Sequence, residues 1–512
     1  MIPARTWVSV LFLVVIGIAL FALVLVSEEN WRAARTLARC ESSLRAAGEN
    51  LDFECFIPPQ VPDAENFAAA PVMSELVRVA QDEKVASPVR TERLRKILGK
   101  EKKAVPSANS GDFLLGKRID LEGWRRALCA GASSPNEKLT DVATAEKILE
   151  CMQTLAPEMA EVTKAAERPF ARFPIDYARG PMMDLRHGTV LLHLSSLFSV
   201  RALAELYAAR PGEGFRDLQT LLRLQHALQP EALVISHLVR LVILARTEQV
   251  IWEGLLQRSW NDAQLEDMQR SLSAIDLLSD YQNVIRGERA FSRITYQLVR
   301  DSRRRDKGKI EALHFFPAFP TALRSLSRLS ASRAFVDQNE ATQEQWMQDF
   351  ILAAIEPKIH RVLRAKSERL NEEIKRSSWG PYAVFAKITL PIFSLATSGT
   401  AAAAAALDEA STAIALERFR LTNGHLPNDL AELVPNYLPR VPTDVMTGET
   451  LHFKKDGVAD YRLYSLGWNL RDDNGAVVLE NSHRREDEKG DWVWPSRAAA
   501  ASGTLAADSA SR

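Results

Sequence analysis

An apolar run between Thr6 and Val26 constrains this chain more than any other feature. It reads TWVSVLFLVVIGIALFALVLV, and no charged residue interrupts it. A helix of about 20 apolar residues crosses the hydrocarbon core of a bilayer. No small-x-small cleavage site follows, so the run predicts an uncleaved signal anchor over residues 1–27. A buried soluble helix is the alternative, and the lack of any polar face disfavours it.

The charges around the run bear on which side of the membrane the body lies. Arg32, Arg35, Arg39 and Arg45 follow it, whereas only Arg5 and the amino terminus precede it. Positive-inside counting alone would place the body in the cytoplasm. Long domains, however, can be translocated largely regardless of nearby charge. The charge pattern therefore does not decide on which side of the membrane the body lies.

Four cysteines, Cys40, Cys55, Cys129 and Cys151, lie in the first third of the chain, and no pair has metal-ligand spacing. An even count in a chain with a membrane signal permits disulfides. The local pairings are Cys40 with Cys55 and Cys129 with Cys151, among three possible connectivities. Four small buried thiols are the alternative.

Composition indicates a mainly helical protein. A chain of 512 residues is long enough for two or more domains. Its 65 basic and 65 acidic residues cancel, so no net field favours nucleic acid or an acidic substrate. Helix-forming residues are abundant and aromatic residues are few. We expect an extended and helical linker region over 28–110 and a domain of antiparallel helical hairpins over 111–385. The clearest candidate helices are 145–155, 190–209, 215–228, 232–256 and 265–285.

The stretch 411–469 has the most specific pattern. An amphipathic helix can end at Asn423-Gly424, because both residues tolerate the left-handed conformation of a helix C-cap. Asn428 or Asp429 can then cap a short second helix. Further on, Asp456-Gly457 is a hairpin signal between two short strands. The expected order is helix, turn, short helix, proline-rich crossing and small antiparallel sheet.

This order resembles the globular part of the type II secretion major pseudopilin. The matching residues are Ala415 to Arg420, Asn423-Gly424, Pro427, Leu433-Val434-Pro435, Tyr437-Leu438-Pro439, Val441-Pro442, Asp444 and Tyr464-Ser465-Leu466-Gly467. The resemblance implies an α+β module over 386–495, followed by a disordered tail over 496–512. The uncharged stretch 388–406 stands where that family carries its assembly helix, but here it is internal and the family's GFTLIE-like peptidase site is absent. We interpret 388–406 as a helix that does not cross the membrane.

The whole chain also resembles a group of uncharacterised membrane-anchored bacterial proteins that often carry this module. Three features carry the resemblance, in this order along the chain: a tryptophan-containing helix after the anchor, a proline-rich segment, and an ENFA-like motif at residues 65–68. It brings no biochemical role with it.

One ligand site follows from the pseudopilin resemblance. That family binds calcium in the loop after its YSLGAD segment, and the aligned residue here is Asn469. Asp472, Asp473, Asp487 and Asp491 follow, and calcium favours clustered oxygen ligands. A solvated acidic loop is the alternative.

The sequence offers no recognisable catalytic motif: HExxH, GxSxG, a glycine-rich phosphate loop and CxxC are all missing. Glu288 and Arg289 suggest a buried ion pair between helices, a structural role. We therefore expect a non-enzyme with no catalytic residues, no nucleic-acid partner and no identified small-molecule substrate.

The expected function is interaction or scaffolding, with a protein partner in the cell envelope. The cysteines and the pseudopilin-like module both favour a single-pass protein of the bacterial inner membrane, with its bulk in the periplasm. The alternatives are an accessory component of a type II secretion or pilus-like system with a calcium-binding module, and an envelope hydrolase without a recognisable motif.

Overall fold

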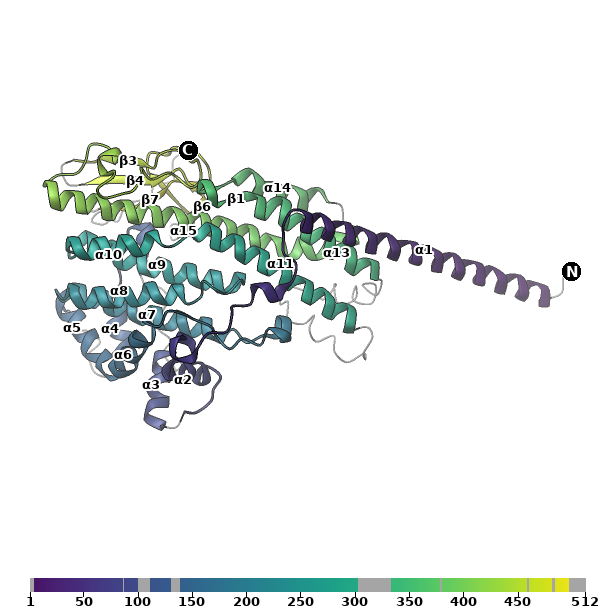
Figure 1. The fold of residues 1–512 in the computed structure, drawn as a ribbon, viewed down its shortest axis with the longest axis horizontal. Coiled ribbons are helices and arrows are strands. Elements are labelled where there is room, and N and C mark those ends of the chain that lie inside the picture. The colour runs from purple at the N-terminus through teal and green to yellow at the C-terminus, as the bar shows by residue number, and fades with distance from the viewer. Residues whose placement is uncertain are drawn as a thin grey trace.

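A computed structural model describes residues 4–85, 87–99, 111–129, 139–302, 333–377, 380–457, 460–480 and 484–496. Its first helix, α1 (Ala4–Ala46), projects away from the rest of the chain (Figure 1). Large apolar side chains along it are open to solvent, from Phe12 at 64% exposed through Leu20 at 58% to Val26 at 50%. Such a surface is costly in water and stable in lipid. The apolar run between Thr6 and Val26 therefore forms the outer part of a long apolar helix that could anchor the chain in a membrane.

Among the described residues, three helices are long and apolar enough to cross a membrane. They are α1, α7 (Arg186–Tyr207) and α15 (Val384–Asn423). The most apolar window of α1 is 0% buried, whereas those of α7 and α15 are 67% and 56% buried inside the protein. Burial against the body accounts for the apolar character of α7 and α15, so α1 is the candidate anchor.

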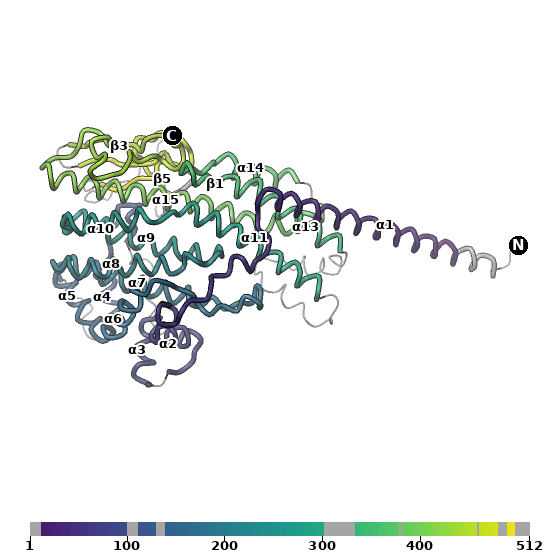
Figure 2. Tube along the Cα trace, viewed as in Figure 1, coloured from purple at the N-terminus to yellow at the C-terminus, as the bar shows by residue number. Residues whose placement is uncertain are grey.

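The longer helices of the body are stacked and run roughly along the long axis of the molecule (Figures 1 and 2). Its amino-terminal helices are α2 (Pro71–Ala80), α3 (Pro88–Ile97), α4 (Leu121–Leu128), α5 (Asp141–Met152) and α6 (Ala156–Ala165). The central ones are α7, α8 (Pro211–His226), α9 (Val234–Gln257), α10 (Asp262–Ser273) and α11 (Leu277–Ser302). Then come α13 (Arg333–Trp346), α14 (Arg364–Arg376) and α15. The mainly helical fold expected from composition is confirmed.

Shorter helical turns connect these helices. They are η1 (Phe53–Phe56), η2 (Asp63–Glu65), η3 (Phe67–Ala69), η5 (Phe113–Leu115), η6 (Gln153–Leu155), η7 (Tyr177–Met182), η9 (Met347–Ile351), η10 (Leu352–Ala354), η11 (Pro357–Ile359), η12 (Pro381–Ala383) and η13 (Leu430–Leu433).

Local chemistry explains where the central helices begin and how closely they pack. Asn261 accepts a hydrogen bond from the backbone N–H of Gln264, and the Gln264 side chain accepts one from the backbone N–H of Asn261. This capping box starts α10. In α9, a Cβ on Gly254 would lie 2.1 Å from Nε1 of Trp260, so only glycine lets that indole lie against the helix.

The helix predicted over 265–285 is wrong as a single element. It is two helices, α10 and α11, separated at residues 274–276. Asp276 accepts hydrogen bonds from the backbone N–H and the hydroxyl of Ser279 in the first turn of α11. A carboxylate in that position starts a new helix rather than continuing the old one.

The carboxyl-terminal part packs on the body through α15, which contacts α9, α10, α11 and α13. This helix ends at Asn423, and Gly424 adopts the left-handed conformation with φ 80°. The sheet above it has strand order β3-β4-β7 and is antiparallel. Its strands are β3 (His452–Lys455), β4 (Tyr461–Ser465) and β7 (Trp492–Trp494). Two further antiparallel pairs are β1 (Ile355–Glu356) with β2 (Arg361–Val362), and β5 (Val477–Glu480) with β6 (Arg484–Gly490).

One hydrophobic core runs from Phe67 through α7, α9 and α15 to Trp494 in the sheet. Trp252 of α9 is fully buried in it and donates a hydrogen bond to the carbonyl of Pro495, at 2.9 Å. The helical body and the carboxyl-terminal elements therefore share a continuous interior.

The cysteines form one disulfide, between Cys129 after α4 and Cys151 in α5. Cys40 is a free buried thiol and Cys55 a free exposed thiol. The local pairing of Cys40 with Cys55 is therefore wrong. Cys40 lies on the face of α1 that packs on α13, where its thiol donates to the carbonyl of Ala341, and so it faces away from any disulfide partner.

Candidate functional site

The site that the structure points to is the junction at which α1 enters the body. Three helices meet there, and α11 supplies a row of arginines along one side. They are Arg286, Arg289, Arg293 and Arg300, spaced by three, four and seven residues. This spacing places all four on one helical face. Arg289 is completely buried, and Arg293 and Arg300 are about one-fifth exposed.

Carboxylates on α13 and on the first segment of the chain oppose this row. Asp337, Glu340 and Glu344 of α13 have the same three-and-four spacing and side chains that are 2%, 2% and 0% exposed. Glu41 in the last turns of α1 and Glu49 just after it complete the set. We call these four arginines and five carboxylates the junction cluster.

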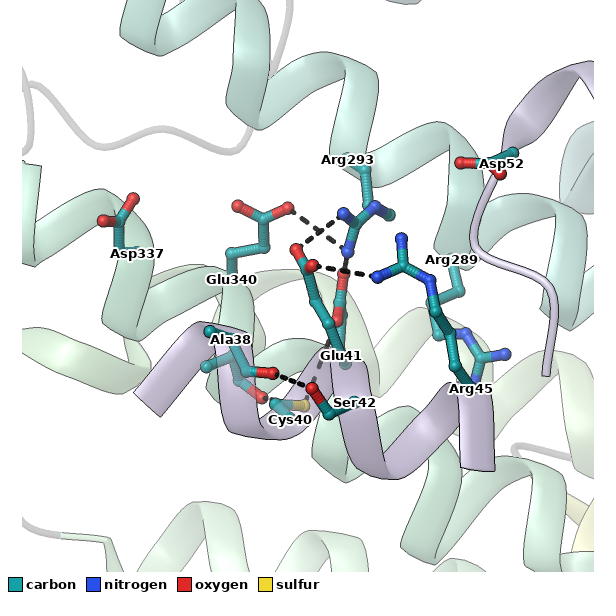
Figure 3. Close-up of polar contacts among 12 residues, drawn as sticks. Ala38, Cys40, Glu41, Ser42, Arg45, Asp52, Arg289, Arg293, Asp337 and Glu340 are labelled. Atoms are coloured by element: carbon teal, nitrogen blue, oxygen red, sulfur yellow. Dashed lines mark hydrogen bonds and ion pairs between the residues drawn. The ribbon is translucent and has the colours of Figure 1, made fainter. Parts of the chain in front are cut away.

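Arg293 is the centre of the junction cluster (Figure 3). Its guanidinium donates to Glu41 of α1 at 2.7 Å and to Glu344 of α13 at 2.6 Å. Glu340 lies 3.9 Å away. A planar guanidinium with five donors can serve several carboxylates at once, which a lysine cannot do with the same geometry. One side chain thus joins α1, α11 and α13.

A second set of contacts holds the end of α1. Glu49 accepts hydrogen bonds from Arg286 at 3.0 Å and from Arg289 at 2.5 Å. Arg289 also donates to the side-chain carbonyl of Gln348 at 2.7 Å. Beneath these ion pairs, Cys40, Leu44, Leu51 and Ala341 form a small apolar cluster. The ion pairs bind the chain just after α1 to α11, and the apolar cluster packs α1 on α13.

A third set lies close to where the apolar run ends. Arg300 donates two hydrogen bonds to Asp337 and pairs with Glu340. The backbone N–H of Ala334 donates to the side chain of Asn30 at 2.8 Å, and the hydroxyl of Tyr382 donates to Glu29 at 2.6 Å. The body therefore contacts α1 within four residues of Val26.

Burial sets the protonation of the cluster. It raises the pKa of Glu340 to about 7, the neighbouring carboxylate of Glu344 adds to the rise, and Arg300 opposes it. It also raises the pKa of Glu344, against the effect of Arg293. At Glu49 burial acts in the same direction, but Arg286 and Arg289 outweigh it and hold the pKa below its usual value. Burial likewise raises the pKa of the Cys40 thiol to about 12, which keeps that thiol protonated and unreactive.

The junction cluster has a mechanical consequence. Ion pairs buried between helices contribute little net stability over apolar packing, but removing one partner is strongly destabilising. Such a cluster therefore accepts one relative position of its helices and penalises others. It favours the direction of α1 seen in the structure, in which these charges are paired.

Sequence reasoning missed this site. It suggested that Glu288 and Arg289 form an ion pair, and that pairing is wrong. Arg289 pairs with Glu49, whereas Glu288 lies on a different face of α11 and accepts a hydrogen bond from the backbone N–H of Val234. The available signal was the matching spacing of arginines in α11 and acids in α13.

The five residues predicted to bind calcium lie in the loop after β4, on β6 and between β6 and β7. Asp491 is fully buried and accepts hydrogen bonds from the backbone N–H groups of Asp473 and Gly475, at 3.3 and 2.7 Å. Asn469 donates to Asp473 at 2.8 Å, and Asp472 accepts from the hydroxyl of Tyr464 at 3.0 Å. Asp487 lies on β6.

These contacts show what the acidic residues do in the loop. Asp491 fixes the loop backbone, and its buried position raises its pKa to about 6. Over the part of the chain that the structure describes, no three His, Cys, Asp or Glu side chains are grouped to hold a metal ion. The description does not extend to the side chain of Asp487, and calcium binding stays a prediction.

Two grooves flank α8. One, of about 560 Å³, lies towards α10 and is lined by Arg223, His226, Arg240, Asp267 and Asp280 among others. Arg240 is buried at its floor and donates to Asp280 at 2.7 Å. The other groove, of about 360 Å³, lies towards α5 and α6. Both are open and lined by a mixture of charged and apolar side chains, so they suit a peptide segment better than a small apolar ligand.

Comparison with known proteins returned no match: no family model, no curated protein and no solved structure is similar to this chain.

Proposed function

We propose that this protein is a membrane-anchored scaffold of the bacterial envelope, with its body outside the cytoplasm and held in a fixed orientation at the inner membrane. The observation that carries the proposal is that α1 is one continuous helix. Its outer part exposes apolar side chains, and its inner part is bound to α11 and α13 by the junction cluster. A flexible linker would suffice for tethering alone. A rigid connection is useful when the body must present a surface at a set height and angle.

The disulfide supports the extracytoplasmic side. Disulfides such as Cys129–Cys151 persist in oxidising compartments and are rare in the cytoplasm. This argument opposes the positive-inside count of Arg32, Arg35, Arg39 and Arg45. We give it more weight, because a long translocated domain overrides that count.

Packing of α15 favours a scaffold over a filament subunit. The carboxyl-terminal order of long helix, Gly424 turn, short helical turn and hairpin supports the proposed likeness to the pseudopilin module. In this chain, however, α15 is internal and more than half of its apolar window is buried against the body. Insertion of α15 into a filament would require its removal from the shared core.

The side of the membrane can be tested with the native thiols. In spheroplasts, a membrane-impermeant maleimide should label Cys55, because this cysteine is exposed. Cys40 should react only after denaturation, because it is buried and its pKa is raised to about 12. Cys55→Ser should remove the label from intact spheroplasts. Labelling that appears only after the inner membrane is permeabilised would place the body in the cytoplasm.

The scaffold role can be tested by site-specific photo-crosslinking in cells. A photo-reactive residue in place of Arg223, which lines the larger groove, should give a discrete adduct with a protein partner. The same residue in place of Arg126 is the control, because Arg126 is 62% exposed and lies outside both grooves. Equal adducts at both positions, or none at either, would remove the groove from the proposal.

A further inference from the structure

The residues of α1 just beyond the apolar run lie at the depth of the lipid headgroups. With a rise of about 1.5 Å per residue, Asn30 is about 6 Å and Arg32 about 9 Å beyond Val26. Each headgroup layer is roughly 5–8 Å thick, and electrostatic attraction extends a Debye length of about 8–10 Å further. Because Asn30 binds the backbone of Ala334, the start of α13 lies at the same level.

At this level α1 has two different faces. Ala33, Leu37 and Cys40 face the body and pack there. Trp31 and Arg32 are exposed on the opposite face, at 60% and about 62%, and so is Arg35, one turn further on. Arg35 lies over the Trp31 ring at 5.1 Å.

Arg333, at the first position of α13, adds a third cation with a side chain that is 69% exposed. We call Trp31, Arg32, Arg35 and Arg333 the collar.

The direction of the collar side chains favours lipid as their partner. Side chains on a helix tilt toward its amino terminus, which for α1 is the end in the membrane. Arginines near the end of a membrane helix extend toward the headgroups in this way, and tryptophan is enriched at the same interface.

Acidic side chains nearby already pair with two of the three collar cations, Arg32 and Arg333. Glu28 pairs with Arg32 at 2.7 Å, Glu29 accepts from Tyr382, and Asp337 is held by Arg300 and lies 3.4 Å from Arg333.

We infer that the collar binds the headgroups of anionic phospholipids and so fixes the body against the bilayer surface. The inference rests on the proposed anchoring by α1 and goes beyond it by naming a lipid class and its ligands. Guanidinium groups bind phosphate oxygens in a bidentate manner, and each cation near a negative surface adds attraction.

The test uses the full chain in nanodiscs of equal phosphatidylcholine and phosphatidylglycerol, with retained lipids counted by native mass spectrometry. The wild type should retain phosphatidylglycerol in preference. Arg32→Gln/Arg35→Gln/Arg333→Gln should reduce that preference by at least about fivefold, since one cation near a charged membrane contributes about that factor.

Two controls separate the collar from general charge. Arg39→Gln alters the same exposed face of α1 about 20 Å beyond Val26, and should leave the preference unchanged. Arg126→Gln/Arg216→Gln/Arg270→Gln removes three cations that are 62%, 72% and 68% exposed on the body, and should also have no effect.

Equal retention of the two lipids by the wild type, or an equal loss in the body triple variant, would overturn the inference. Failure of the anchor would give a different result, because the chain would not enter nanodiscs at all.

Discussion

Arg293→Met is expected to weaken the attachment of α1 to α11 and α13 by about 3–5 kcal/mol. The substitution keeps an unbranched side chain of similar length but leaves Glu344, which is completely buried, without its cation. Glu41 on α1 loses the same partner. The measurement is hydrogen exchange of the α13 amides in the full chain in nanodiscs, where protection reports the free energy of local opening.

Two variants make the Arg293 result specific. Arg270→Met removes a surface arginine that pairs with Asp267, and it should change protection by less than about 1 kcal/mol. Glu344→Gln in the Arg293→Met background removes the orphaned charge, so it should restore much of the loss. An unchanged exchange rate in Arg293→Met would mean that the junction cluster does not hold α1.

Ile16→Arg/Leu20→Arg is expected to abolish stable insertion of the chain into membranes. Both side chains are exposed on α1, and an arginine near the centre of a membrane helix costs about 2.5–3.5 kcal/mol. The pair lies on one face of the helix, one turn apart, so the two costs add to roughly 5–7 kcal/mol. Alkaline carbonate extraction of membranes measures the outcome, and the variant should move to the soluble fraction.

The matched control is Ile16→Leu/Leu20→Ile, which conserves the apolar surface and should stay in the membrane pellet. Resistance of the double-arginine variant to carbonate would contradict the assignment of α1 as the anchor.

The sequence predicted correctly those elements that are determined by interactions between residues close together in the chain. The apolar run between Thr6 and Val26, the end of α15 at Asn423-Gly424 and the hairpin around Asp456-Gly457 each depend on neighbouring residues. The short turn after Asp429 also follows, since that side chain accepts from the backbone N–H of Ala431. Such elements can be predicted from the sequence because the interacting residues lie within a few positions of one another in the chain.

The junction cluster could not be predicted in the same way, because its partners are remote in sequence. Glu41 and Arg293 are 252 residues apart, and Glu49 and Arg289 are 240 apart. The four-residue spacing of Arg289 and Arg293 places them on one face of a helix, but it does not say which helix opposes that face. The tail 496–512 was predicted to be disordered, and all of it beyond Ser496 lies outside the described residues.

The rigid connection of anchor and body is tested most directly by an electron-spin distance measurement. Spin labels would be placed at Phe21→Cys in the anchor and Arg376→Cys on the exposed surface of α14, in a Cys55→Ser background with Cys40 left buried. In nanodiscs, a continuous α1 held by the junction cluster predicts one narrow distance distribution, which Arg293→Met should broaden. A broad distribution in the wild type would contradict a fixed orientation and leave only a flexible tether.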